Sequence, residues 1–441
     1  MKKQSSITQA VRQRLFELLK ITSVTLLLFV LVDVFFGAWI MSLVRPTDTF
    51  RVRHPIYHHT LKPNFDGIGY WGTWTYRVCT DANGFKTHCQ KKNKSNSKVF
   101  DVAFLGDSFT EGVGLPYEQT FVGMVTAKTP ELTIANLGAV SYSPAIYLAK
   151  LKALYAKGYQ FKHLIVFIDI GDAYDEANTY DLYDDTVVVD KGEPYPLSFS
   201  HQLRRSAAQY LPLAVEVWTQ INKLGASKNN VTAQATIPTP RVTPLVASTT
   251  EPPVEQSAGK VALPDPATRN NNTSTQNTQQ SVDLALPAAA SPTLSSQAPF
   301  IKNIYEGVYL KDYPKSEWTY NSQSPHYGID GVNGTLAKMK KEMQALYTLA
   351  QSQGTKLSIG VYPWPGQIKH DVVESQQVKI WREFCQSRCA HFYNTFPSFF
   401  ALAQQQKSDE FIYDYYFQGD VHFNERGNEV IANLLLNTGI K

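Results

Sequence analysis

Three side chains in the sequence have the types needed for a serine nucleophile and its base. Ser108 lies in the stretch FLGDSFTEG, directly after a run of strand-forming residues, and Asp420 and His422 lie near the C-terminus. A serine hydroxyl is a poor nucleophile until a histidine accepts its proton, and a carboxylate orients and stabilises the resulting imidazolium. These residues predict acyl transfer through an acyl-serine, provided that the fold brings the two segments together.

Each segment also has a purely structural explanation. The polar stretch around Ser108 could be an ordinary turn between a strand and a helix, and Asp420 could cap a helix that leaves His422 on the surface. The position of Ser108 directly after a predicted strand favours the chemical interpretation, because ligands bind past the carboxyl ends of parallel strands. A serine at that place lies beside the N–H groups that open the next helix, and these groups can hold developing negative charge.

The Gly-Asp-Ser motif at residues 106–108, together with Asp420 and His422, resembles the SGNH, or GDSL, hydrolase superfamily. The resemblance covers roughly 99–441 and is closest to membrane-associated bacterial members related to carbohydrate O-acetylesterases and O-acetyltransferases. It implies an α/β/α fold with Ser108 as the nucleophile, His422 as the general base and Asp420 as its partner. The spacing Asp-x-His is shorter than the commoner Asp-x-x-His, and is similar to that of membrane-associated members that act on exopolysaccharide acetylation.

The same resemblance places the oxyanion hole at Ser108, Gly138, Ser141 and Gly171. Ser141 stands where the family has a glycine, and its backbone N–H survives that change. Gly171 stands where the family has an asparagine, so the side-chain donor is missing, a loss that typically costs ~10²–10³ in rate. This departure predicts that the Gly171 N–H or another group substitutes, that the enzyme is slow, or that the protein is not a plain hydrolase.

Further polar and aromatic residues follow the later predicted strands. Asp172, Asp175 and Glu176 could contact sugar hydroxyls or bind a cation, or could simply favour the start of a helix. Trp364 could stack on a sugar ring or belong to the core. We take Asp107, Asp172 and Trp364 as candidate substrate-binding residues, and we predict neither a bound metal nor a cofactor.

Runs of strand length alternate with helical patterns along most of the chain. The predicted strands are 99–105, 132–137, 163–170 and 356–362, and the predicted helices are 143–158, 335–354 and 424–437. Such alternation predicts an α/β fold, here a three-layer α/β/α arrangement with a five-stranded parallel, flavodoxin-like sheet. Neither half of the chain has enough strands alone, so we expect both halves to build one sheet.

Composition divides the chain into segments. Residues 227–299 are rich in Thr, Pro, Ser, Ala, Asn and Gln, which predicts a disordered insertion thrown out of a single domain. The SGNH-type domain would then comprise 99–226 and 300–441. Before it, 45–98 mixes aromatic residues, glycines and turn signals, which predicts short antiparallel strands packed on the main domain.

Four cysteines allow three disulfide pairings. Local pairing is the simplest, because Cys79 and Cys89 flank the turn signal Asp-Ala-Asn-Gly, and Cys385 and Cys389 are one helical turn apart. The spacing does not resemble that of a zinc site. Three histidines of the preceding segment could bind a metal, although such side chains are more often exposed or simply hydrogen-bonded: His54, His58 and His59.

Residues 21–44 form a nearly uncharged stretch whose one charged residue is Asp33. At 1.5 Å per residue, this stretch can cross a bilayer core of roughly 30 Å. Because it lacks a convincing cleavage site, we predict an uncleaved, single-pass anchor. Basic residues in 1–20 hold the N-terminus in the cytoplasm and place the rest of the chain outside it, in the periplasm or an equivalent space. Asp33 could be tolerated through local water, a partner helix or a functional role.

The net charge of +4 is spread along the chain, which argues against nucleic acid as a partner. The features together predict a membrane-anchored, exported serine esterase or O-acyltransferase that acts on an O-acylated, above all O-acetylated, envelope carbohydrate. The alternatives are a lipase or thioesterase at the membrane surface and a catalytically weak glycan-binding module. A transferase would need an acyl donor outside the cytoplasm, so we expect a multi-span membrane acyltransferase as its partner.

Overall fold

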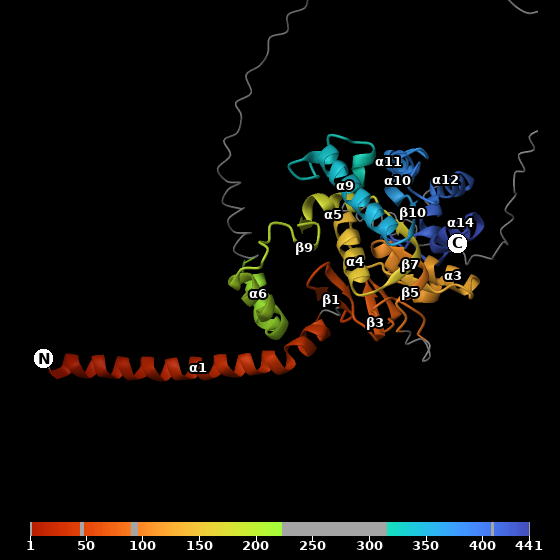
Figure 1. Cartoon of the computed structure of the whole chain (residues 1–441). Coiled ribbons are helices and arrows are strands. Elements are labelled where there is room, and N and C mark those ends of the chain that lie inside the picture. The colour runs from red at the N-terminus through yellow and green to blue at the C-terminus, as the bar shows by residue number, and fades with distance from the viewer. Residues whose placement is uncertain (1, 45–47, 90–95, 223–314, 407–409, 441) are drawn as a thin grey trace, which may run out of the picture. The chain divides into compact units, whose positions relative to one another are not determined.

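A five-stranded parallel sheet forms the centre of the protein. The computed structural model describes residues 2–44, 48–89, 96–222, 315–406 and 410–440 (Figure 1). The strand order is β11-β10-β7-β5-β6. The strands are β5 (Val99–Leu105), β6 (Ile134–Asn136), β7 (Gln160–Phe167), β10 (Lys356–Val361) and β11 (Phe392–Asn394). All neighbouring pairs in this sheet are parallel, so the predicted α/β class and five-stranded parallel sheet are confirmed.

Both halves of the chain contribute to this one sheet. Strand β7 precedes the predicted insertion and pairs in parallel with β10, which follows it, with Leu164 opposite Leu357. The last five residues of β7 are all buried, as expected of a central parallel strand covered on both faces. Strand β11 is only three residues long, too short for a strand pattern to be recognised at this position. The insertion at 227–299 lies outside the described residues.

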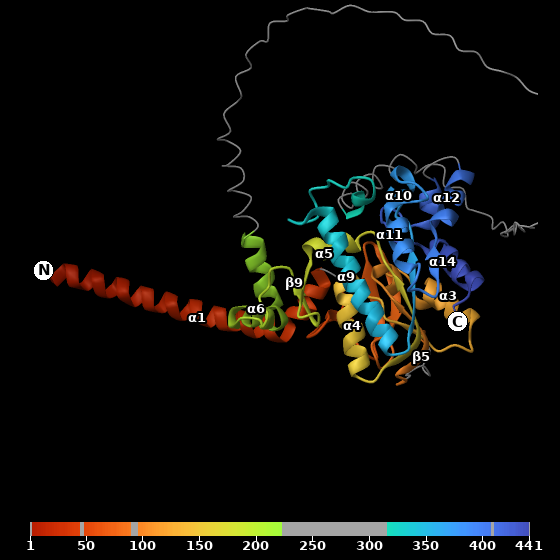
Figure 2. The ribbon, with the colours of Figure 1, turned by 45° about the horizontal axis from the view of Figure 1, so that its top comes forward.

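Helices connect the strands and carry the main apolar contacts. The helices of this part are α2 (Ser108–Glu111), α3 (Phe121–Lys128), α4 (Pro144–Ala156), α5 (Asp172–Asn178), α6 (Phe199–Tyr210), α9 (Gly331–Ser352), α10 (Pro365–His370), α11 (Gln376–Cys385), α12 (Phe396–Gln405), α13 (Glu410–Tyr415) and α14 (Glu425–Thr438). Helix α4 packs against α9, and α3 packs against α14 (Figure 2). The three helices predicted from periodicity correspond to α4, α9 and α14, with bounds that differ by a few residues.

The segment before the sheet forms two antiparallel hairpins, as predicted. Strand β1 (Arg51–His54) pairs with β2 (His58–Leu61), and β3 (Asp66–Trp71) pairs with β4 (Trp74–Cys79). A third hairpin, of β8 (Tyr180–Tyr183) and β9 (Val187–Asp190), follows α5.

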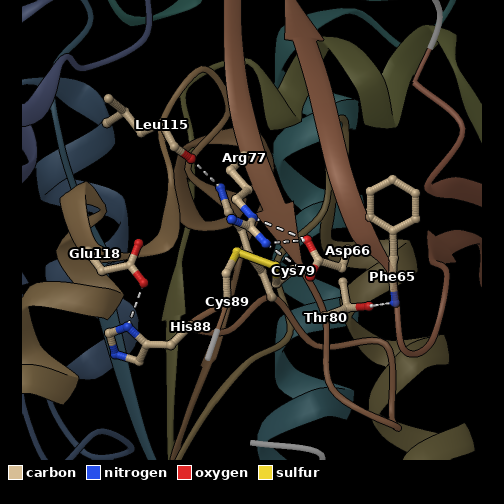
Figure 3. Close-up of a disulfide and its surroundings, with 10 residues drawn as sticks. Phe65, Asp66, Arg77, Cys79, Thr80, His88, Cys89, Leu115 and Glu118 are labelled. Carbon is tan, nitrogen blue, oxygen red and sulfur yellow. Dashed lines mark hydrogen bonds and ion pairs between the residues drawn. A yellow bond between two sulfur atoms is a disulfide. The ribbon is translucent and has the colours of Figure 1, made fainter. Parts of the chain in front are cut away.

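The disulfides follow the local pairing. Cys79 at the end of β4 is joined to Cys89, with Cα atoms 5.1 Å apart (Figure 3). Figure 3 also shows His88, whose ring nitrogen lies 2.7 Å from a carboxylate oxygen of Glu118 and so links this segment to the main domain. The second disulfide joins Cys385 to Cys389 at the end of α11.

Helix α1 (Lys2–Val44) contains the apolar stretch Arg12–Met41, which is long and apolar enough to cross a membrane. By length and composition alone, such a helix near the N-terminus suits either a membrane span or a signal sequence. The two disulfides are consistent with an oxidising compartment.

Candidate functional site

Ser108, His422 and Asp420 lie together and are connected by hydrogen bonds. The Oγ atom of Ser108 is 2.7 Å from Nε2 of His422, and Nδ1 of His422 is 2.5 Å from Oδ1 of Asp420. Ser108 is 6% exposed and His422 is 8% exposed, and both line one pocket. Residues 314 positions apart are therefore joined in one hydrogen-bonded set, with the Asp420 carboxylate on the far side of the imidazole.

The end of strand β5 and the short helix α2 position Ser108. The side chain of Asp107 caps this helix, accepting a hydrogen bond from the N–H of Phe109 at 3.0 Å. Gly106 is required here, because a Cβ atom at this position would lie 2.1 Å from Oγ1 of Thr110. The ring of Phe109 stacks on the imidazole of His422, with centroids 4.4 Å apart. The strand end and the helix start thus fix both the nucleophile and one face of its base.

The loop before α14 positions the base. Asn424 caps α14, and its side-chain amide donates to backbone carbonyls of the preceding turn, including that of Asp414 at 2.9 Å. The backbone N–H of His422 donates to Oδ1 of Asp420 at 3.0 Å, and its carbonyl accepts from the N–H of Phe417 at 2.8 Å. Asn424 is therefore the helix cap, whereas His422 faces the serine and Asp420 contacts the opposite side of the imidazole.

Trp71 at the end of strand β3 holds the carboxylate of the triad. Its indole Nε1–H donates to Oδ2 of Asp420 at 2.9 Å, and its ring meets His422 edge-on at 4.8 Å between centroids. Burial opposes ionisation of Asp420, but His422 and these donors outweigh it, so the pKa of Asp420 lies below its ordinary value. Sequence reasoning missed Trp71, because only the folding of the first hairpins onto the domain brings it to the site.

The loop after strand β6 offers one free backbone donor among those predicted for the oxyanion. The N–H of Gly138 donates to the side chain of Asn136, and the N–H of Val140 donates to Glu111, both at 3.0 Å. Ser141 has φ of 55° and lines the pocket. Among the described residues, the N–H groups of Ser108 and Ser141 have no hydrogen-bond acceptor, whereas that of Gly138 is occupied.

The N–H of Gly171 is also occupied, because it donates to Oδ2 of Asp169 at 3.0 Å. Trp364 donates through its indole Nε1 to Oδ1 of the same carboxyl at 2.6 Å. A Cβ atom on Gly171 would lie 2.8 Å from Oδ2 of Asp169 and 3.1 Å from the Trp364 ring. The space that a side chain at position 171 would need is therefore taken by Asp169 and Trp364.

Three buried carboxyl groups lie behind the serine. One oxygen from each of Asp107, Asp169 and Asp172 falls within 4.8 Å of the others. Burial, and then the charge of neighbouring carboxyls, raises the pKa of Asp169 and of Asp172 well above the ordinary value. Burial also raises the pKa of Asp107, against the opposing charge of His422. These groups are therefore held toward their neutral forms.

The pocket beside Ser108 measures about 290 Å³. Its lining includes the substrate-binding candidates Asp107 and Trp364, although Trp364 is only 6% exposed. Asp172 is 1% exposed and does not line the pocket; it accepts a hydrogen bond from the Tyr147 hydroxyl at 2.8 Å, so its place is structural. Lys315 also lines the pocket and was not singled out from the sequence.

The remaining acidic residues of the third strand end have different surroundings. Asp175 lines the pocket, and burial raises its pKa to about 6. Glu176 instead accepts from the Ser143 hydroxyl at 2.8 Å and pairs with Lys338 at 2.7 Å, which ties α5 to α4 and α9. The helix-start explanation thus fits Asp172 and Asp175, which stand in the first turn of α5.

The three histidines of the first hairpin are hydrogen-bonded. His54 accepts from the N–H of Ile56 at 3.2 Å, and a ring nitrogen of His58 lies 2.7 Å from Asp190. A ring nitrogen of His59 lies 2.6 Å from the carbonyl of Val140. The hydrogen-bonding explanation accounts for all three side chains.

No protein-family model matches this chain, and no curated protein matches it. The case for its chemistry therefore rests on the geometry of Ser108, His422 and Asp420.

Proposed function

We propose that this protein is an SGNH-type serine esterase or O-acyltransferase. The observation that carries the proposal is the connected set of Ser108, His422 and Asp420 at the carboxyl end of β5, beside a pocket. Two observations support a three-layer, flavodoxin-like arrangement of the domain. Strand β5 is the second strand from one edge of the sheet. The helix pairs α4–α9 and α3–α14 lie on either side of the sheet in Figures 1 and 2.

The proposed reaction begins with proton transfer from Ser108 to Nε2 of His422 as the serine oxygen attacks the acyl carbonyl. Asp420 stabilises the imidazolium that forms. The unoccupied N–H groups of Ser108 and Ser141 hold the oxyanion. The carbon–oxygen bond to the leaving alcohol then breaks, and the alcohol takes the proton from His422, which leaves an acyl-serine.

The second half of the reaction transfers the acyl group from Ser108 to an acceptor. His422 removes a proton from water in an esterase, or from a sugar hydroxyl in a transferase, and that oxygen attacks the acyl-serine. Collapse of the second intermediate returns the proton from His422 to the serine oxygen. Burial raises the pKa of Asp169, and its carboxyl lies nearest to the space that a side chain at position 171 would take, so in its protonated form it is our candidate for the missing donor.

The pocket supports a short acyl group on a polar substrate. Four carboxyl side chains and two indole rings line it, which suits sugar hydroxyls and a sugar ring face better than an alkyl chain. This lining favours an O-acetylated carbohydrate over the alternative of a long-chain lipid. The apolar helix α1 supports attachment to a membrane, with the domain outside the cytoplasm and, for a transferase, a multi-span membrane acyltransferase as the source of acyl groups.

A glycan-binding module is the second candidate, and the glycine at position 171 favours it. A binding module has no use for a serine whose hydroxyl is 2.7 Å from a buried imidazole, so we place this candidate after the enzyme.

Labelling with a fluorophosphonate probe separates the two candidates. We expect the detergent-solubilised full chain to be labelled and to hydrolyse a short-chain aryl acetate, and the Ser108→Ala variant to do neither. Ser143→Ala is the matched control, because Ser143 is also a buried serine but donates to Glu176. Folded protein that resists the probe and leaves the ester intact would overturn the enzyme proposal.

A further inference from the structure

One carboxylate in the apolar stretch of α1 is buried. Asp33 is 1% exposed, whereas most of its neighbours in the stretch Arg12–Met41 are exposed apolar residues. Its two oxygens accept hydrogen bonds from the backbone N–H groups of Leu213 and Ala214, at 2.9 and 2.8 Å. A segment about 180 residues further along the chain is therefore attached to the apolar helix.

The donors are the N–H groups that open a second helical segment, residues 212–222. The first N–H groups of a helix have no partner within it, and a carboxylate is a strong acceptor for them. Gly37, one turn after Asp33, allows the close approach, because a Cβ atom there would lie 3.1 Å from Cγ of Pro212. Asp33 thus caps another helix.

This attachment lies at membrane depth if α1 spans a bilayer. Asp33 precedes Met41, the end of the apolar stretch, by eight residues (41 − 33). At about 1.5 Å per residue, this separation is about 12 Å, well within a bilayer core of roughly 30 Å. With the N-terminus in the cytoplasm and Met41 as the outer end of the span, the start of the second helix lies in the outer leaflet, close to the bilayer midplane. Unpaired backbone N–H groups at that depth are costly, and Asp33 satisfies two of them.

Helix α6, which directly precedes the capped segment 212–222, exposes a stripe of large apolar side chains. Phe199, Leu203 and Tyr210 in α6 are 79%, 59% and 60% exposed. At 100° per residue these three side chains share one face of the helix. Val217 in the following helix is 52% exposed. Exposed apolar patches of this kind mark surfaces that contact lipid or another protein.

We propose that residues 199–222 form a second membrane element, which packs on the anchor at Asp33 and turns its apolar stripe toward the acyl chains of the outer leaflet. The proposal rests on the membrane anchoring proposed above. It attaches the domain to the bilayer twice, through α1 and through the connection that follows β9.

Nitroxide labels on the full chain in lipid nanodiscs test this arrangement. Leu203→Cys and Val217→Cys report the stripe, Leu28→Cys reports the anchor, and Val372→Cys reports an exposed apolar residue of the main domain. The native cysteines are held in disulfides and do not react. We expect labels at 203 and 217 to be relaxed by oxygen more than by a water-soluble nickel chelate, as at 28, with the opposite order at 372.

Labels at 203 and 217 that behave like the label at 372, while the label at 28 stays in lipid, would overturn the second membrane element alone. A water-exposed label at 28 would overturn the anchoring itself, and the element with it. Labels shielded from both reagents in native membranes would show that a protein partner covers the stripe in place of lipid, which also contradicts the proposal.

Amide hydrogen exchange in nanodiscs tests the role of Asp33 directly. Asp33→Ala removes both acceptors, so we expect exchange at residues 213 and 214 to accelerate about tenfold or more. Thr25→Val is the matched control, because the Thr25 hydroxyl bonds only to the carbonyl of Ile21 in its own helix. Equal exchange rates at 213 and 214 in the two variants would overturn the capping role.

Discussion

At the scale of single residues, the site includes a hydrogen-bond donor, Trp71, that takes no part in the proposed proton transfers. Asp420 keeps one oxygen for His422, and the Trp71 indole occupies the other. This arrangement holds the carboxylate in one orientation and favours its ionised form. Trp71 is therefore a positioning residue for the base, supplied by a hairpin that lies outside the α/β sheet.

We predict that Trp71→Phe lowers the rate of serine labelling and kcat by ~10–100-fold, because a hydrogen bond to a charged group is worth about 1.5–3 kcal/mol. Trp74→Phe is the control, since Trp74 lies in the same hairpin and packs on Phe417. The thermal midpoints of both variants should stay close to that of the parent. Equal labelling rates for Trp71→Phe and Trp74→Phe would contradict the positioning role.

The raised pKa of Asp175 makes the stability of the folded protein depend on pH. Burial raises its pKa to about 6, so between about pH 4 and pH 6 the unfolded chain loses a proton that the folded protein retains. Stability is therefore lost as the pH rises through that window. We predict that Asp175→Asn removes this loss, gaining up to about 3 kcal/mol relative to the parent between pH 4 and pH 7. Urea unfolding at pH 4 and pH 7 measures the free energy of unfolding of both proteins. A difference between variant and parent that is the same at both pH values would refute the prediction.

At the scale of elements, strands of the first two hairpins contact residues of the candidate site. Arg51 of β1 donates to the fully buried carboxylate of Glu111 at the end of α2. The same carboxylate accepts from the N–H of Val140, next to the oxyanion donor Ser141. The ion pair of Arg51 and Glu111 thus connects the preceding segment, helix α2 and the loop after β6.

We predict that Glu111→Gln destabilises the protein by about 3–5 kcal/mol, because it removes the fully buried carboxylate that Arg51 faces and leaves this cation with Asp48 alone. Asp66→Asn is the matched control, since the Asp66–Arg77 pair lies in the same segment but has side chains more than half exposed. Its loss should cost under about 1 kcal/mol. Denaturant unfolding measures the loss of unfolding free energy in each variant. Similar losses for Glu111→Gln and Asp66→Asn would contradict the structural importance of the Arg51–Glu111 pair.

At the scale of the whole molecule, an apolar helix precedes a domain that carries two disulfides. Either a membrane span or a signal sequence explains both features, because disulfides persist outside the cytoplasm. The uncleaved anchor that we propose is the first of these.

We predict that the full chain stays in the membrane fraction after alkaline carbonate extraction. A version in which a cleavable secretion signal replaces residues 1–45 should be held far less firmly, because it lacks both α1 and the Asp33 acceptors of residues 213 and 214. The mass of the mature protein checks the uncleaved state. A mature chain that begins after the apolar stretch would show that this stretch is a signal sequence.

The sequence by itself determined the alternation of strands and helices, the apolar N-terminal stretch and the identities of Ser108, Asp420 and His422. These features are local, since periodicity and motif spacing depend on neighbouring residues. The local disulfide pairing was also the simplest one available to the sequence.

Only the tertiary structure decided which groups meet. Trp71 reaches Asp420 from 349 residues away, and the backbone donors at Gly138 and Gly171 proved to be occupied by Asn136 and Asp169. Asp172 lies behind the pocket, although its position in the sequence placed it at the rim. Hydrogen-bond partners and burial depend on the packing of distant segments, and no local pattern encodes that packing.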